Sequence, residues 1–144
     1  MTIKNHGSAI WKGTLKAGIG AVSTETGVLS DQPYGFNTRF EGETGTNPEE
    51  LIGAAHASCF AMALSMILGE HDLEAEEIRA ISTVSLDKDD GGFAITKIHL
   101  DVSAKVPGTD DAAFQAAAKA AKEGCPVSKV LAGAEITMMA RLDA

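Results

Sequence analysis

One stretch of the chain, from Asn47 to Gly69, limits most strongly what the sequence can fold into. Asn47 can cap a helix with its side-chain oxygen, and Pro48 suits the first helical position because proline has no N–H to leave unpaired. Gly69 is a residue type that often ends a helix. Between these signals, Leu51 to Leu68 is apolar except for Gly53, His56, Ser58 and Ser65. A helix that is apolar on every face is expected to be buried on every face.

A stretch of this length could also cross a bilayer, which takes about 20 apolar residues. The segment has no flanking aromatic belts or basic clusters, and it starts too late in the chain to be a signal peptide. We therefore expect no membrane span. The sequence instead predicts a central helix wrapped by sheets, from one subunit or from two.

Composition excludes several classes of protein. The chain has 144 residues, 44% of them hydrophobic, which fits one globular domain over residues 1–144. A formal charge of -8 without any Lys/Arg run would repel phosphates, so we expect neither a nucleic-acid partner nor an anionic membrane surface. Two cysteines and no secretory signal predict a cytoplasmic protein with free thiols or a redox pair.

The remaining elements follow from alternation, turn residues and caps, and they predict an α+β fold. An N-terminal β-meander precedes the central helix, and a β-hairpin, a second helix, a short helix and a C-terminal strand follow it. The predicted strands and helices are Ala9 to Leu15, Gly18 to Thr24, Tyr34 to Phe40, Ile78 to Asp87, Phe93 to Val106, Asp110 to Glu123 (helix), Pro126 to Leu131 (helix) and Ala134 to Leu142.

The two cysteines differ in their local surroundings. Cys125 directly precedes Pro126 at a predicted helix N-terminus, a position that lowers a thiol pKa and makes the thiol more reactive. Cys59 lies within the apolar helix, where burial raises a thiol pKa. Taken alone, Cys59 is more simply one small core residue, which is what a buried cysteine usually is. If the fold brings both thiols and a cation together, Cys59 becomes a candidate nucleophile.

Histidines offer two further interpretations. A zinc site would need His56 or His99 beside the cysteines, whose spacing is not that of a metal finger, so we predict no metal. His56 lies one turn before Cys59 and could act as a base, although a core or interface histidine is the more common case.

Several motifs together resemble one family. They are Asn37 to Phe40, Thr46 to Ala57, Cys59 with Phe60, and Gly124 to Ser128. In combination, and at these spacings, they resemble the osmotically inducible protein C (OsmC) family over essentially the whole chain. The N-terminal meander, with Arg39 deep in the chain, looks more like OsmC proper than like the organic hydroperoxide resistance (Ohr) proteins.

The resemblance implies an intertwined, obligate homodimer that acts as a thiol peroxidase on organic hydroperoxides in stress defence. Cys59 then matches the peroxidatic nucleophile and Cys125 the resolving thiol. Arg39 matches the arginine that holds the thiolate, and Glu49 the carboxylate that orients it. The resemblance implies no bound cofactor, and it implies an external dithiol of lipoyl type, rather than thioredoxin, as the reductant.

Helix geometry adds an expectation about the subunits. Glu49 and Cys59 are separated by roughly 15 Å along an ideal helix axis and about 80° around it, so one straight helix cannot bring both to one site. We therefore expect the Glu49 that serves a given Cys59 to come from the partner subunit. An apolar wall that includes Phe36, Phe60 and Met62 is expected to favour alkyl or lipid peroxides.

Two alternatives to a peroxidase stay open on the residues alone. One is a small-molecule-binding protein on the same dimeric scaffold whose thiols are incidental. The other is a structural stress protein without turnover. Loss of peroxide consumption on Cys59→Ser would exclude the first, and repeated cycles with a dithiol reductant would exclude the second.

Overall fold

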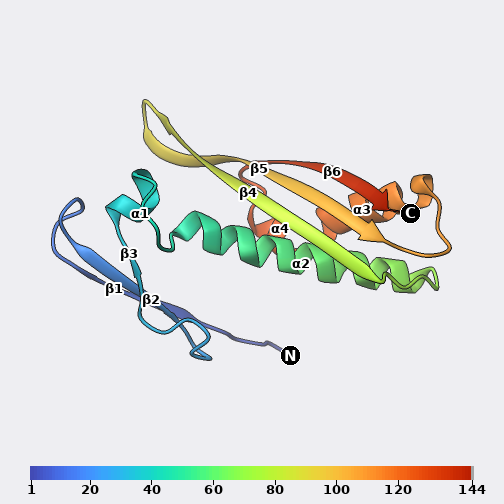
Figure 1. Ribbon diagram of the computed structural model, residues 1–144, viewed down its shortest axis with the longest axis horizontal. Coiled ribbons are helices and arrows are strands. Elements are labelled where there is room, and N and C mark those ends of the chain that lie inside the picture. Colours follow the sequence, from blue (N-terminus) through green and yellow to red (C-terminus); the bar gives the residue numbers. More distant parts are fainter. Residues whose placement is uncertain (144) are drawn as a thin grey trace. The chain divides into compact units, whose positions relative to one another are not determined.

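The computed structural model describes residues 1–143 (Figure 1). The chain falls into two compact units, Met1–Leu51 and a second that begins at Ile52, and each unit is described by itself. The prediction of one domain over the whole length stays a prediction.

The first unit is a small antiparallel sheet followed by a short helix. Its strands β1 (Gly7–Lys12), β2 (Ile19–Thr24) and β3 (Gln32–Tyr34) pair in sequence order, which confirms the predicted meander. The prediction of a third strand over Tyr34 to Phe40 was wrong, because most of that segment forms the helix α1 (Phe36–Phe40). The Thr38 hydroxyl accepts a hydrogen bond from the Gly35 N–H (2.9 Å), and this local contact stabilises a helical turn despite the β-favouring side chains.

The long helix α2 (Pro48–Glu70) begins in the first unit and continues into the second. The Asn47 side chain accepts a hydrogen bond from the Glu50 N–H at 2.9 Å, as predicted for the cap. Glu49 and Glu50 place negative charge in the first turn, where it stabilises the positive end of the helix dipole.

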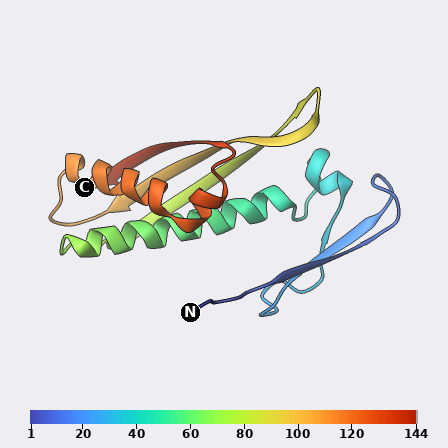
Figure 2. The ribbon, with the colours of Figure 1, turned by 180° about the vertical axis from the view of Figure 1, so that it is seen from behind.

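The second unit is a three-stranded sheet with helices on one face, seen from behind in Figure 2. Strands β4 (Glu77–Asp89) and β5 (Gly92–Lys105) form the predicted hairpin, and β6 (Glu135–Asp143) pairs with β5 in parallel. A parallel pair needs a crossover connection, which the helices α3 (Asp111–Gly124) and α4 (Pro126–Val130) supply.

Helix α2 is buried along one side only within this unit, so the prediction of burial on every face was wrong for the single chain. Phe60, Leu64 and Leu68 pack into the core with strand residues and with Phe114 of α3. Met62, in contrast, is 75% exposed. Among residues 1–143, α2 is the one helix long and apolar enough to cross a membrane, a property that the core helix of a soluble protein shares.

Glycine is required where α2 crosses β4. A Cβ added to Gly53 would lie 2.7 Å from the carbonyl oxygen of Ser82, closer than real Cβ atoms approach. The absence of a side chain therefore lets the helix backbone lie directly against the strand. This close approach also places the following turn of α2 beside Ser82.

Candidate active site

The two cysteines, 66 positions apart in the sequence, meet in the second unit. The sulfur atoms of Cys59 on α2 and Cys125, the residue before α4, lie 2.7 Å apart, and both cysteines are free thiols. Cys125 is fully buried, whereas Cys59 is partly exposed. A reagent from solvent therefore reaches Cys59 first, and Cys125 is placed to react with whatever forms there.

The surroundings shift the pKa values of the two thiols in opposite directions. Burial, together with the hydrogen bond and charge of Cys125, raises the pKa of Cys59. Burial alone would also raise the pKa of Cys125, but hydrogen bonds from Cys59, Ser128 and Val127 outweigh it and lower that pKa. Within this unit, the surroundings therefore favour the thiolate form of Cys125 over that of Cys59.

A buried histidine connects the second cysteine to the sheet. His56 is fully buried, and its Nδ1 and Nε2 atoms each lie 2.8 Å from a serine hydroxyl, that of Ser82 on β4 and that of Ser128 on α4. Burial lowers the pKa of His56, so the ring is neutral. Ser128 in turn hydrogen-bonds to Cys125. Sequence reasoning assigned no role to either serine, because their contacts with His56 span 26 and 72 positions.

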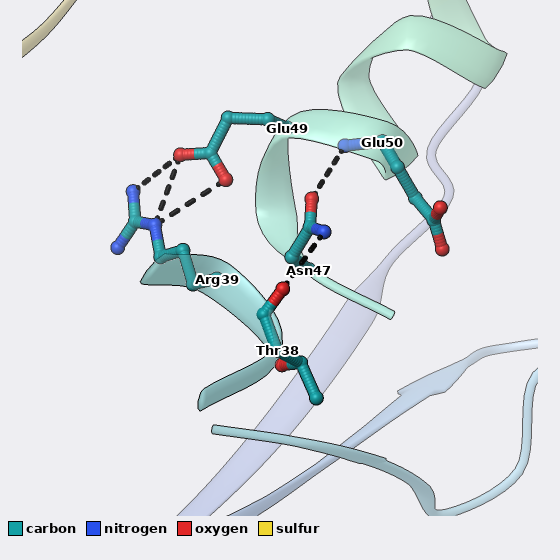
Figure 3. Close-up of polar contacts among 5 residues, drawn as sticks. All are labelled: Thr38, Arg39, Asn47, Glu49 and Glu50. Atoms are coloured by element: carbon teal, nitrogen blue, oxygen red, sulfur yellow. Dashed lines mark hydrogen bonds and ion pairs between the residues drawn. The ribbon is translucent and has the colours of Figure 1, made fainter. Parts of the chain in front are cut away.

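Arg39 and Glu49 form a close ion pair in the first unit (Figure 3). The Arg39 Nε lies 2.9 Å and its Nη2 2.7 Å from the same carboxylate oxygen, and Nε also reaches the second oxygen at 3.3 Å. Asn47 donates to the Thr38 carbonyl oxygen (3.3 Å), which connects α1 to the start of α2. The predicted pairing of Arg39 with Glu49 is thus present within one chain.

Apolar and aromatic side chains surround Arg39. A cavity of about 250 Å³ is lined by Trp11, Leu15, Tyr34, Gly35, Phe36, Arg39 and Phe40. Phe36 lines this cavity. Phe60 lies in the core of the second unit and Met62 is exposed in the single chain, so the wall that Phe36, Phe60 and Met62 were predicted to form together stays a prediction. Sequence reasoning missed Trp11 and Tyr34, which pack at a centroid distance of 5.6 Å from separate strands.

The structure thus brings the four predicted site residues together in two pairs, one in each unit. No cluster of three or more potential metal-ligating side chains occurs among residues 1–143. Both ring nitrogens of His56 are occupied by serine hydroxyls. Two free thiols in contact, one partly exposed and one held at a helix start, define a two-cysteine redox protein on an α+β fold.

Comparison with known proteins then gives the family. The model of the OsmC-like protein family matches residues 40–139, and the chain belongs to this family. That range includes Glu49, Cys59 and Cys125, and Arg39 lies one residue ahead of it.

Two relatives separate the branches of the family. The chain is 61% identical over 138 residues to "Peroxiredoxin OsmC" of Escherichia coli (strain K12), which covers 96% of each chain. It is 36% identical over 115 residues to "Organic hydroperoxide resistance protein OhrB" of Bacillus subtilis (strain 168), over 79% of this chain and 82% of that one. The predicted likeness to OsmC proper rather than to the Ohr proteins is confirmed.

Solved structures confirm the fold. The crystal structure of OhrB of Bacillus subtilis superposes with a TM-score of 0.67 at 32% identity, covering 96% of this chain and 98% of that one. An OsmC-like protein from Mycoplasma pneumoniae superposes with a TM-score of 0.77 at only 14% identity, covering 100% of both chains. The predicted OsmC-like α+β fold is therefore present.

Proposed function

We propose that this protein is a cysteine-based peroxidase that reduces organic hydroperoxides to alcohols in stress defence. The observation that carries the proposal is the 2.7 Å separation of the Cys59 and Cys125 sulfur atoms, with Cys59 partly exposed and Cys125 buried. The relatives named as a peroxiredoxin and as organic hydroperoxide resistance proteins support the same reaction class.

The reaction divides into two balanced steps. The Cys59 thiolate attacks the outer peroxide oxygen, the O–O bond breaks, and the alkoxide takes up a proton and leaves as the alcohol. Cys59 is then a sulfenic acid. The Cys125 thiolate attacks the Cys59 sulfur, the S–O bond breaks, and hydroxide takes up a proton and leaves as water. The resulting disulfide holds the two oxidising equivalents of the peroxide until an external dithiol, of lipoyl type, reduces it.

The first step needs a positive charge beside Cys59, because its own unit raises the pKa of that thiol. We assign this role to Arg39, whose guanidinium stays charged and is oriented by the forked contact with Glu49. With that charge in place, the proton shared by the two sulfurs would move to Cys125. Since Arg39 and Glu49 are paired within one chain, the partner subunit that supplies Glu49 would supply Arg39 with it.

An obligate homodimer fits the surface of α2. Met62 and Met66, one turn apart, are 75% and 61% exposed in the single chain, which is unfavourable for large apolar side chains in water. Burying them against a second copy would give the central helix the full burial that its sequence indicates. Two free thiols also fit a cytoplasmic location, where the compartment keeps thiols reduced.

The aromatic cavity beside Arg39 favours substrates with an apolar group next to the peroxide. Alkyl and lipid hydroperoxides have such a group, and hydrogen peroxide does not. We therefore propose organic hydroperoxides as the preferred substrates.

A peroxide-consumption assay with cumene hydroperoxide and dihydrolipoamide tests the proposal. Cys59→Ser is expected to abolish the first step. Cys125→Ser is expected to form a sulfenic acid that a dimedone-type reagent captures, but no disulfide. Unchanged peroxide consumption by Cys59→Ser would instead support the alternative of a non-catalytic binding protein, and loss of the sulfenic acid in both variants would refute the assigned roles.

A further inference from the structure

Four polar side chains form a connected series that ends at the resolving thiol. The Nδ1 of His56 lies 2.8 Å from the Ser82 hydroxyl, and its Nε2 lies 2.8 Å from the Ser128 hydroxyl. A side-chain hydrogen bond from Ser128 is in turn one of the contacts that lower the pKa of Cys125. His56 and Cys125 have no exposed surface, and Ser128 has 4%. The peroxidase steps derived above use neither His56 nor the two serines.

The direction of these hydrogen bonds follows from the number of protons available. A neutral imidazole has one N–H donor and one acceptor nitrogen, and each serine has one hydroxyl proton. If Ser128 donates to the sulfur of Cys125, its oxygen must accept from the Nε2–H of His56. Nδ1 then accepts from the Ser82 hydroxyl. Every donor in the series points toward the sulfur, and every buried group has a partner.

We propose that His56 is the positioning residue of the resolving thiol: by donating to Ser128 at 2.8 Å, it orients that hydroxyl as a donor to the Cys125 sulfur for the second step. The inference rests on the proposed function and deepens its second step. His56 touches neither sulfur in this arrangement and transfers no proton. Its neutral state, favoured by burial, suits a fixed donor better than a general base.

Other charged groups near Cys125 do not replace this effect. Cys59 is the other titratable group in direct contact with Cys125 among the described residues, and it is chemically consumed in the first step. The Lys122 ammonium on α3 donates to the Ile136 carbonyl oxygen. On α3, α4 and β4, the charged side chains Glu123, Lys129, Glu77 and Arg79 are exposed to solvent. Arg79 and Glu77 also pair with each other.

The first arm of the test measures Cys125 without any peroxide. In a Cys59→Ser background Cys125 is the single thiol of the chain, and the ultraviolet absorbance of its thiolate gives its pKa. Ser128→Ala and His56→Leu are each expected to raise that pKa by about one unit, a tenfold loss of thiolate below it. Ser82→Ala should raise the pKa of Cys125 less, because Ser82 lies one hydrogen bond further from the sulfur than His56 does.

Two variants control this arm. His56→Gln keeps one donor and one acceptor but cannot take up a proton in this range, so it should restore most of the effect that His56→Leu removes. His99→Gln alters a histidine whose Nδ1 contacts the Thr137 hydroxyl at 2.6 Å, away from the cysteines, and should leave the titration unchanged. If His56→Leu fails to fold, Ser128→Ala decides the question.

The second arm follows disulfide formation after one equivalent of cumene hydroperoxide. A thiol whose pKa rises by one unit has tenfold less thiolate but is intrinsically about threefold more nucleophilic, so the net rate falls about threefold at low pH. At alkaline pH, Ser128→Ala should be as fast as wild type or faster. The two pH profiles therefore cross, which a general loss of packing would not produce.

These arms separate the inference from the proposed function. Absence of a Cys59 sulfenic acid in Cys125→Ser would refute the peroxidase proposal, and the titration would still decide the role of His56. The inference would be overturned if the pKa of Cys125 in Ser128→Ala and in His56→Leu equalled its pKa in the Cys59→Ser parent. An equally large rise of the Cys125 pKa in His56→Gln and in His56→Leu would also overturn it, because His56 would then have to act as a proton-transferring base.

Discussion

The sulfur of Cys125 lies 2.7 Å from that of Cys59, yet only Cys59 is open to solvent. In the proposed mechanism, access to solvent rather than acidity separates the roles of these two thiols. Acidity by itself points the other way, because the local hydrogen bonds favour the thiolate at Cys125. A peroxidatic Cys59 therefore depends on a cation, and the first prediction concerns that cation.

We expect Arg39→Lys to slow sulfenic acid formation at Cys59 by about tenfold or more, equivalent to about 1.4 kcal/mol in the barrier. Lysine keeps the charge, but its single ammonium cannot reproduce the contact of both Nε and Nη2 with Glu49. Reactions quenched at successive times with a sulfenic-acid trap give the rate of sulfenic acid formation. Arg79→Lys is the matched control, since Arg79 forms an exposed pair with Glu77. Equal rates for Arg39→Lys and wild type would show that charge alone suffices.

Gly53→Ala is expected to destabilise the protein by about 1–3 kcal/mol, because the new methyl group would press on the Ser82 carbonyl oxygen. Chemical denaturation measures the change in the free energy of unfolding. Gly69→Ala is the control near the other end of α2, where no atom lies within 4 Å of an added Cβ. It should be neutral or stabilising by up to about 1 kcal/mol. A destabilisation of the same size in both variants would contradict the close crossing of α2 and β4.

The free energy of unfolding should fall as the pH drops below about 6.5, the pKa of an unperturbed histidine. Burial lowers the pKa of His56 in the folded state, so the unfolded chain binds the proton first and acid favours unfolding. The stabilisation is complete above the unfolded pKa and declines toward the folded one, at up to about 1.4 kcal/mol per pH unit. Denaturation of wild type and His56→Gln at several pH values isolates this contribution. If the free energy of unfolding depends on pH in the same way in both proteins, groups other than His56 cause the acid sensitivity.

Met62→Asp is expected to dissociate the proposed dimer into monomers, because it places a charge on the exposed apolar face of α2. Sedimentation at several protein concentrations measures the change. Met139→Asp serves as the control, since Met139 is 66% exposed on the outer face of the sheet of the second unit. If both variants stay dimeric, the dimer uses another surface. If both dissociate, the outer face of the sheet also takes part.

The sequence by itself determined α2, α3 and α4 and most strands, because the signals involved act over a few residues. Asn47 caps α2 and Asp110 caps α3, where its side chain accepts from the Ala113 N–H. Pro126 opens α4 as predicted. Local signals failed at α1, where β-favouring residues form a helical turn through the contact of Thr38 with Gly35.

Only the tertiary structure decided which side chains meet. The parallel pairing of β5 with β6 requires the crossover through α3 and α4, and this connection carries Cys125 and Ser128 back to α2. Such contacts depend on the packing of apolar faces across the whole sheet rather than on neighbouring residues. The buried serine–histidine series has no signature in the sequence, because a hydroxyl becomes a positioned donor only where burial removes the competing water.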